Sequence, residues 1–169
     1  MSVSAQGGRV AAGRQRLADA TWPDFGAAGI GAQVPVLTMA GVVAAGDIAA
    51  GMRIVTRHGM QRVLAVTVTE ETQVRVIRLC RDVLGQGRPG EDVLLCPEQP
   101  ILLRDWRARA LYGRDQALVP VARLVDGEFI RAETLARFRA VRLQLDQPAV
   151  IYAGGLELGF GAIERVRTG

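Results

Sequence analysis

Lysine is absent from this sequence, so all 21 of its basic residues are arginine. Together with the abundance of Ala, Gly and Val, this pattern indicates GC-rich coding. The sequence pI of about 10.0 is therefore weak evidence for a nucleic-acid partner. The net charge of +4, spread over 169 residues, is small for a protein that binds a strongly charged partner.

Histidine and cysteine are almost as scarce. His58 is the only histidine, and Cys80 and Cys96 are the only cysteines. One histidine and two cysteines have none of the paired ligand spacing that zinc sites show, and two cysteines make no disulfide framework. The sequence therefore predicts no metal ion and no cofactor, two reduced thiols, and a solvated histidine in the turn at residues 57–59.

Long apolar runs are also missing. The longest, residues 34–46, is stopped by Asp47 and is far shorter than the about 20 residues that cross a membrane. The N-terminal residues have no continuous apolar core of the kind that a secretory signal needs. The expectation is synthesis in the cytoplasm with no membrane contact, and incorporation into a particle remains open.

The composition is that of a globular protein, with 49% apolar and 22% charged residues, and the length predicts one domain. Residues 1–28 stand apart because they are rich in Ser, Gly, Ala and Arg, and glycine weakens helices. We interpret them as an N-terminal arm, followed by a domain at 29–169. Trp22 and Phe25 are bulky residues for such an arm, and they could dock on this domain or on a partner.

From residue 33 onward the pattern is typical of strands. Short runs rich in β-branched residues recur with Gly and Pro between them, which predicts an all-β barrel or sandwich. The expected strands are 34–38, 42–43, 52–56, 62–69, 74–79, 93–95, 101–103, 140–145, 149–153 and 156–160. Two short helices are expected at 121–124 and 132–138, and Glu70 and Glu71 are expected at a hairpin tip.

Five segments in order resemble the bacterial Hedgehog/intein (Hint) family over about residues 29–160. The family block Leu-Gly-x-Gly-x-Pro-x-x-Asp-Leu-x-x-Ser-Pro-x-His is the most specific, and residues 84–99 are similar to it. The other similar segments are 35–38, 48–59, 112–124 and 148–156. The resemblance implies an all-β Hint-like horseshoe or barrel of short strands with one or two short helices.

The family's chemistry is a self-directed acyl shift, in which a Cys or Ser attacks the preceding carbonyl and a histidine protonates the departing amine. The resemblance places the nucleophile at about Gly29, the block histidine at Gln99 and the terminal histidine at Pro148. None of these can do that chemistry, since Gln cannot carry a proton between groups near pH 7. Cys96 replaces the Ser or Thr of the corner, and its apolar surroundings predict a buried thiol with a raised pKa.

An arginine-rich segment follows the second apolar run. Arg104, Trp106, Arg107 and Arg109 place an aromatic ring among arginines, as nucleic-acid and carboxylate surfaces do. The alternative interpretation is a solvent-facing strand whose Trp packs under arginine stems.

Three hypotheses of function follow. The first is a catalytically inactive Hint-fold protein, not an enzyme, that serves as a structural or protein-binding module. It would be a subunit of a larger assembly, such as a phage-like or secreted particle, with arm 1–28 contacting other subunits and homo-oligomers left open. The second is residual self-processing by an unrecognised nucleophile. The third is arginine-mediated binding of nucleic acid, for which the sequence gives the weakest support.

Overall fold

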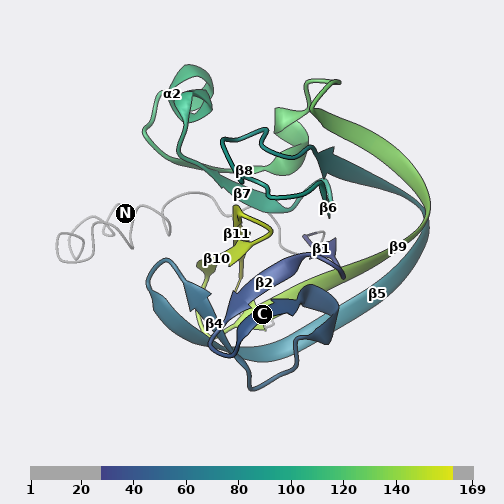
Figure 1. The fold of residues 1–169 in the computed structure, drawn as a ribbon, viewed down its shortest axis with the longest axis vertical. Coiled ribbons are helices and arrows are strands. Elements are labelled where there is room, and N and C mark those ends of the chain that lie inside the picture. The colour runs from purple at the N-terminus through teal and green to yellow at the C-terminus, as the bar shows by residue number, and fades with distance from the viewer. Residues whose placement is uncertain (1–27, 162–169) are drawn as a thin grey trace, which may run out of the picture.

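The computed structural model describes residues 28–161, so the predicted arm, including Trp22 and Phe25, lies outside the described residues. Within 28–161 the chain is mostly β, as predicted, and its strands curve around a central core (Figure 1). The strands are β1 (Ile30–Gly31), β2 (Pro35–Thr38), β3 (Gly41–Ala44), β4 (Arg53–Thr56), β5 (Gly59–Leu79), β6 (Val93–Leu95), β7 (Pro100–Leu103), β8 (Ala117–Pro120), β9 (Ile130–Leu145), β10 (Ala149–Ala153) and β11 (Leu156–Phe160).

All of these strands belong to one antiparallel network. Its order is β6-β1-β9-β5-β4-β2-β10-β11-β7-β8, and β3 pairs with β2. Strand β5 also pairs with β6, and β4 with β10. Segments distant in sequence therefore lie side by side: the two residues of β1 are held between β6 and β9. This placement brings the start of the described chain against the corner that follows β6.

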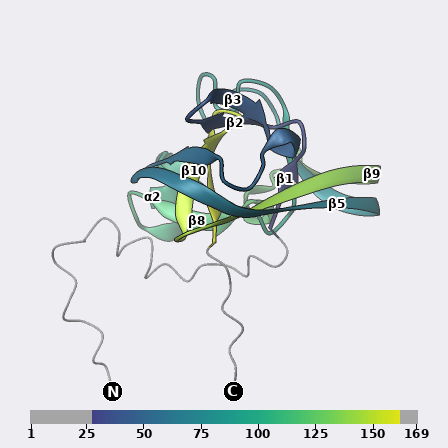
Figure 2. The same cartoon turned by 90° about the horizontal axis from the view of Figure 1, so that it is seen from below.

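The longest feature is an antiparallel ribbon of β5 and β9, paired from Val63–Leu145 to Leu79–Ile130. It sweeps around one side of the fold and projects beyond the other strands (Figures 1 and 2). Residues 62–69 and 74–79 were expected as separate strands, but both belong to β5. Glu70 and Glu71 are therefore in mid-strand, paired with Arg139 and Phe138, and not at a hairpin tip.

The helix expected at 132–138 is wrong, because these residues form part of β9. Every residue from Ala132 to Leu135 pairs with the β5 segment 74–77, and those long-range hydrogen bonds override the local helical tendency. The burial pattern also has the strand period: Glu133 and Leu135 are half-buried, whereas Ala132 and Thr134 are exposed.

The α-helix of the described region is α2 (Trp106–Tyr112). The carboxylate of Asp105 accepts a hydrogen bond from the Arg107 backbone N–H at the N-terminus, and Gly113 takes the left-handed conformation at the end, with φ of 65°. The solvent-facing strand considered for this segment is therefore wrong. The short helix expected at 121–124 is present as the 3-10 helix η4 (Val121–Leu124), and a second one, η3 (Ala45–Asp47), follows β3.

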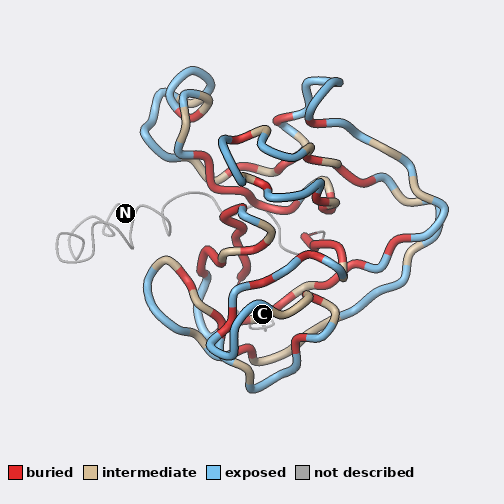
Figure 3. The backbone as a smooth tube through the Cα atoms, in the orientation of Figure 1, coloured by how far each residue is buried: buried red, intermediate tan, exposed pale blue. Residues whose placement is uncertain are grey.

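A single main core lies inside the curved sheet. Its members are branched aliphatic residues from nearly every strand, with Phe160 fully buried among them. A small satellite core of Val76, Cys96, Phe138 and Ala140 packs where the ribbon crosses the corner after β6. Figure 3 shows buried residues along the inner strands and exposed ones at the outer bend of the ribbon. The corner containing Cys96 therefore packs on the ribbon through this satellite core.

Candidate functional site

The structure brings together three of the four positions that the family resemblance indicated. Gly29 directly precedes β1, and Cys96 directly follows β6, which pairs with β1 through Ile30 and Leu95. The Cys96 backbone N–H donates to the Gly29 carbonyl at 3.0 Å, and the Gly29 backbone N–H donates to the Gln99 side chain at 3.1 Å. We refer to Gly29, Cys96 and Gln99 as the corner cluster.

Gln99 is fully buried, with none of its surface exposed, and each end of its amide has a backbone partner. Oε1 accepts from the Gly29 N–H, while Nε2 donates to the Pro100 carbonyl at 3.0 Å and the Gly159 carbonyl at 2.8 Å. An amide suits this environment because it presents an acceptor on one side and two donors on the other. The side chain thus joins β1, β7 and β11.

The backbone of the corner is also held by hydrogen bonds. The Gln99 N–H donates to the Cys96 carbonyl, and the Gln99 carbonyl accepts from Val121, both at 3.0 Å. The Pro97 carbonyl accepts from Ala122 at 2.9 Å. Helix η4 therefore closes over the corner, and the backbone groups needed to hold Gln99 are already paired.

Cys96 is 7% exposed and fills the space beside Gly29. Burial raises the pKa of its thiol to about 11, with Glu71 adding to the rise and Arg142 opposing it. A Cβ atom added at residue 29 would lie 3.0 Å from the Cys96 Sγ, closer than carbon and sulfur normally approach. The cluster therefore has no room for a side chain at residue 29 unless Cys96 shifts.

The fourth position is separate from the cluster. Pro148 is exposed and lies just before β10. Its strand is nonetheless adjacent, because Val150 pairs with Gly159, the residue whose carbonyl accepts from Gln99. A proline ring has no proton to donate and no acceptor on its side chain, so nothing at this position replaces a histidine.

The arginines after β7 are engaged in ion pairs. Arg104 makes a two-point contact with Glu157, through Nε at 2.7 Å and Nη2 at 2.5 Å. Arg57 reaches the same carboxylate at 3.3 Å. The hydrogen bond to Glu157 raises the pKa of the Arg104 guanidinium. This triad joins β7, β11 and the turn after β4, so Arg104 has a structural partner.

The other members of the segment are paired around helix α2. Arg107 contacts its neighbour Asp105 at 2.6 Å, and its guanidinium lies 4.9 Å from the ring centre of Trp106. Arg109 forms an ion pair with Asp115. Trp106 is 68% exposed. Because each of these arginines is paired with a carboxylate, the segment presents less unbalanced positive charge than its sequence suggested.

The remaining expectations concern the histidine, metal ligands, membrane-spanning helices and the cysteines. His58 lies in the turn between β4 and β5 and is exposed, as the sequence predicted. In residues 28–161 no three His, Cys, Asp or Glu side chains gather into a group that could hold a metal ion. No helix in the same residues is long and apolar enough to cross a membrane. Cys80 and Cys96 both carry free thiols.

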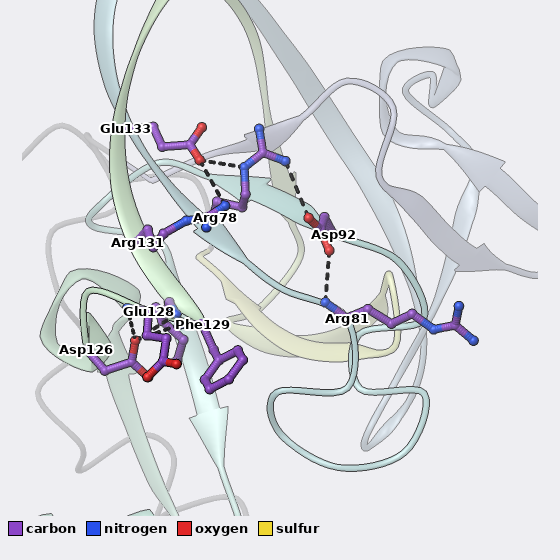
Figure 4. Close-up of polar contacts among 9 residues, drawn as sticks. Arg78, Arg81, Asp92, Asp126, Glu128, Phe129, Arg131 and Glu133 are labelled. Atoms are coloured by element: carbon purple, nitrogen blue, oxygen red, sulfur yellow. Dashed lines mark hydrogen bonds and ion pairs between the residues drawn. The ribbon is translucent and has the colours of Figure 1, made fainter.

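The described residues also form two hollows, of which the smaller adjoins the cluster. The larger is a groove of about 1090 Å³ between the β2–β3 hairpin, the 87–94 loop and β9. Its charged wall includes Arg78, which contacts Glu133 at 2.7 Å and Asp92 at 3.7 Å (Figure 4). The smaller is a cleft of about 400 Å³ between the ribbon and the corner, lined in part by Cys96 and Ala28.

Comparison with solved structures gives the class of protein. The fold is similar to a bacterial intein-like domain from Clostridium thermocellum (18% identity, 79% of this chain and 97% of that chain, TM-score 0.57). It is also similar to a DnaB intein from Synechocystis sp. PCC 6803 (12%, 80% and 99%, 0.54) and to the gp41-1 intein (11%, 78% and 97%, 0.53). The protein therefore has an intein-like fold.

The family follows from the sequence profile of the Hint domain, which matches residues 31–158. The chain belongs to the Hint domain family, as its sequence segments indicated. No curated protein matches it.

Sequence reasoning missed Glu157, a buried carboxylate that holds two arginines. The signal was present, because Glu157 interrupts the apolar run 156–160 of a central strand, and a buried acid needs a cationic partner. What the sequence did not supply was the partner, since Arg104 and Arg57 lie 53 and 100 positions away.

Proposed function

We propose that this Hint domain does not process itself and serves as a structural, protein-binding module in a larger protein assembly. The corner cluster carries the first part of the proposal. Gly29, Cys96 and Gln99 stand together at the expected centre, but hydrogen bonds and packing occupy all three. A fold shared with inteins does not by itself confer their chemistry.

An acyl shift needs a nucleophile and a group that protonates the departing amine. Gly29 has no side chain, and Cys96 limits the space for one. With a pKa of about 11, the Cys96 thiol is ionised in roughly one molecule in ten thousand at pH 7. The Gln99 amide does not titrate in this range, and its N–H groups are already donated to Pro100 and Gly159.

The large groove supports the second part of the proposal, the protein-binding role. Its walls combine the exposed apolar residues Leu37 and Val42, on paired strands, with charges of both signs from Asp47 and Arg139. An apolar floor with a charged rim is typical of protein interfaces. Strand β3, which contributes Val42, pairs with β2 alone among the strands of residues 28–161, so its other edge can accept a further strand. A segment of another subunit suits this groove.

The test is to recover the tagged chain gently from its own cells and to read intact masses and stoichiometry of everything that accompanies it. We expect the uncut 169-residue chain in a fixed ratio with other proteins. Arg139→Glu, in the groove, should release those proteins, whereas Arg62→Glu, an exposed arginine outside the groove, should keep them. Release by neither variant would contradict the groove as the binding surface, and a chain shortened near Gly29 would contradict the absence of cleavage.

A further inference from the structure

Strand β3 has a free edge at the large groove. Among the strands of residues 28–161 it pairs with β2 alone, and Figure 2 shows it beside β2 at the margin of the fold. Its partner Pro35 has no N–H, and the Pro35 carbonyl accepts from Gly154 at 2.7 Å, so the Pro35–Ala44 pair exchanges no hydrogen bonds. The N–H and C=O groups of Ala44 therefore point away from β2, and so do those of Val42, because alternate residues of a ladder point the same way.

The same two residues place apolar side chains in the groove. Side chains two positions apart on a strand share a face, and Val42 and Ala44 line the groove together with their cross-strand partners Leu37 and Pro35. Val42 is 68% exposed and Leu37 is 38% exposed. A strand added at this edge would therefore continue an apolar face, with every second side chain directed into the groove.

The β9 wall of the groove carries two arginines that have no side-chain partner in residues 28–161. Arg137 and Arg139 are exposed and form no ion pair there, although Glu70 is opposite Arg139 in the ribbon. Arg139 is held near the end of β3, because its carbonyl accepts from Ala32, whose own carbonyl accepts from Gly46. Unbalanced positive charge thus lies beside one end of the free edge.

The acids that line the groove come from other elements. Asp47 belongs to η3, whereas Glu91 and Asp92 belong to the 87–94 loop, and Asp92 is already in contact with Arg78 at 3.7 Å. A carboxylate on a bound segment would therefore be attracted to the β9 wall and repelled by the others, which selects one orientation. A guanidinium also gives a carboxylate charge-assisted hydrogen bonds, which are stronger than neutral ones.

We propose that the groove binds an extended segment of a partner protein as an added strand on β3. An apolar side chain of that segment lies beside Val42, and an acidic side chain two positions along the segment binds Arg137 and Arg139. The occupant is thus a strand-forming stretch with the pattern apolar-x-acidic. This inference names the chemistry of the partner and rests on the protein-binding role proposed above.

A synthetic peptide tests this chemistry on the full-length protein. The probe is a heptapeptide blocked at both ends, Thr-Val-Thr-Asp-Thr-Val-Thr, which places valine and aspartate on one face and has the same order in both directions. Its titration into isotope-labelled protein, followed by NMR, should shift the amide signals of Val42, Ala44 and the β9 wall. The same peptide with asparagine in place of aspartate should bind about tenfold more weakly.

Variants of the protein test the contribution of charge. Arg137→Glu combined with Arg139→Glu should reverse the preference, so that a peptide with lysine in place of aspartate binds better than the aspartate peptide. Arg62→Glu is the matched control, because Arg62 is exposed and lies outside the groove, and it should leave the preference for aspartate unchanged.

Two further changes test the strand pairing. Ala44 has a φ of −60°, which proline adopts, so Ala44→Pro removes the outward N–H and should weaken binding by about tenfold in a protein whose circular dichroism is unchanged. On the peptide, methylation of the N–H groups of valine and aspartate is compared with methylation of those of the threonines. Only one of the two sets should abolish binding, because only alternate N–H groups face β3.

Several results would overturn the inference. They are no amide shifts in the groove, equal affinity for the aspartate, asparagine and lysine peptides, and binding that neither methylated peptide loses. Self-association of the protein that protects the β3 amides would also overturn it, because that would place a second copy at this edge. Partner proteins that still accompany the chain in a fixed ratio and leave it on Arg139→Glu would uphold the proposed function even then, so the two failures are distinguishable.

Discussion

Replacing Gln99 by methionine should destabilise the fold more than its modest change in shape suggests. Methionine is similar in length and can fill the same space, but it cannot pair with the three backbone groups that the amide now satisfies. These are the N–H of Gly29 and the carbonyls of Pro100 and Gly159, and all three bonds are buried. A buried polar group left unpaired costs about 1–3 kcal/mol, so the three together predict a loss of about 3 kcal/mol or more.

That loss is large against the about 5–15 kcal/mol by which domains are stable. The assay is urea unfolding of Gln99→Met followed by far-UV circular dichroism. Gln86→Met, at an exposed position of the 85–90 turn, is the matched control and should stay within about 0.5 kcal/mol of the wild type. A Gln99→Met protein that differs from the wild type by less than the control would refute the structural role of this amide.

Gln99→His tests how many of the three buried hydrogen bonds contribute to stability. A neutral imidazole offers one acceptor and one donor, so it can serve the Gly29 N–H and one carbonyl, and the remaining carbonyl stays unpaired. The expected loss is about 1–3 kcal/mol, smaller than that of Gln99→Met. The reverse order of the two variants would show that volume and not hydrogen bonding governs this position.

The remaining predictions concern ion pairs. Glu157→Ala removes the common partner of Arg104 and Arg57. Because Arg104 is partly exposed, the expected loss in the free energy of unfolding, measured with urea, is about 2 kcal/mol, below the usual range for buried pairs. No loss would contradict a stabilising role of this triad. Glu133→Gln tests pH dependence. The hydrogen bond from Arg78 lowers the pKa of Glu133, so its stabilisation is present above the ordinary glutamate pKa and is lost as pH falls through the folded-state pKa. Unfolding curves of wild type and Glu133→Gln should therefore differ at neutral pH and converge in acid, and a gap independent of pH would exclude this pair as its cause.

Much of the fold could be predicted because short-range signals agreed with it. Residues 149–153 and 156–160 are strands with the expected bounds, since β-branched and aliphatic runs end there at glycines. The prediction of a helix at 132–138 failed because the structure of this segment depends on pairing with β5, about sixty positions earlier in the chain. No local pattern reveals that pairing. Helix α2 was missed although Asp105 and Gly113 mark its two ends.

The corner cluster could be predicted in part for a similar reason. The Ser/Thr-Pro-x-His block survives as a backbone frame around Pro97, and the structure places Cys96 and Gln99, two positions that the family resemblance indicated, beside Gly29. Their hydrogen bonds could not be predicted, because Gly159, which accepts from Gln99, is 60 positions away. The thiol pKa was predicted in direction only, from the leucine run that precedes Cys96, and its burial in the structure supplies the cause.

The central claim, that the corner cluster holds the fold together and does not cut the chain, is tested most directly by intact mass. The purified full-length protein would be incubated for days near neutral pH with and without a small thiol, which releases a thioester, or hydroxylamine, which releases a thioester or an ester. Our account predicts one species, the uncut chain, under every condition. A product that begins near Gly29, or one whose yield rises with the added nucleophile, would contradict it.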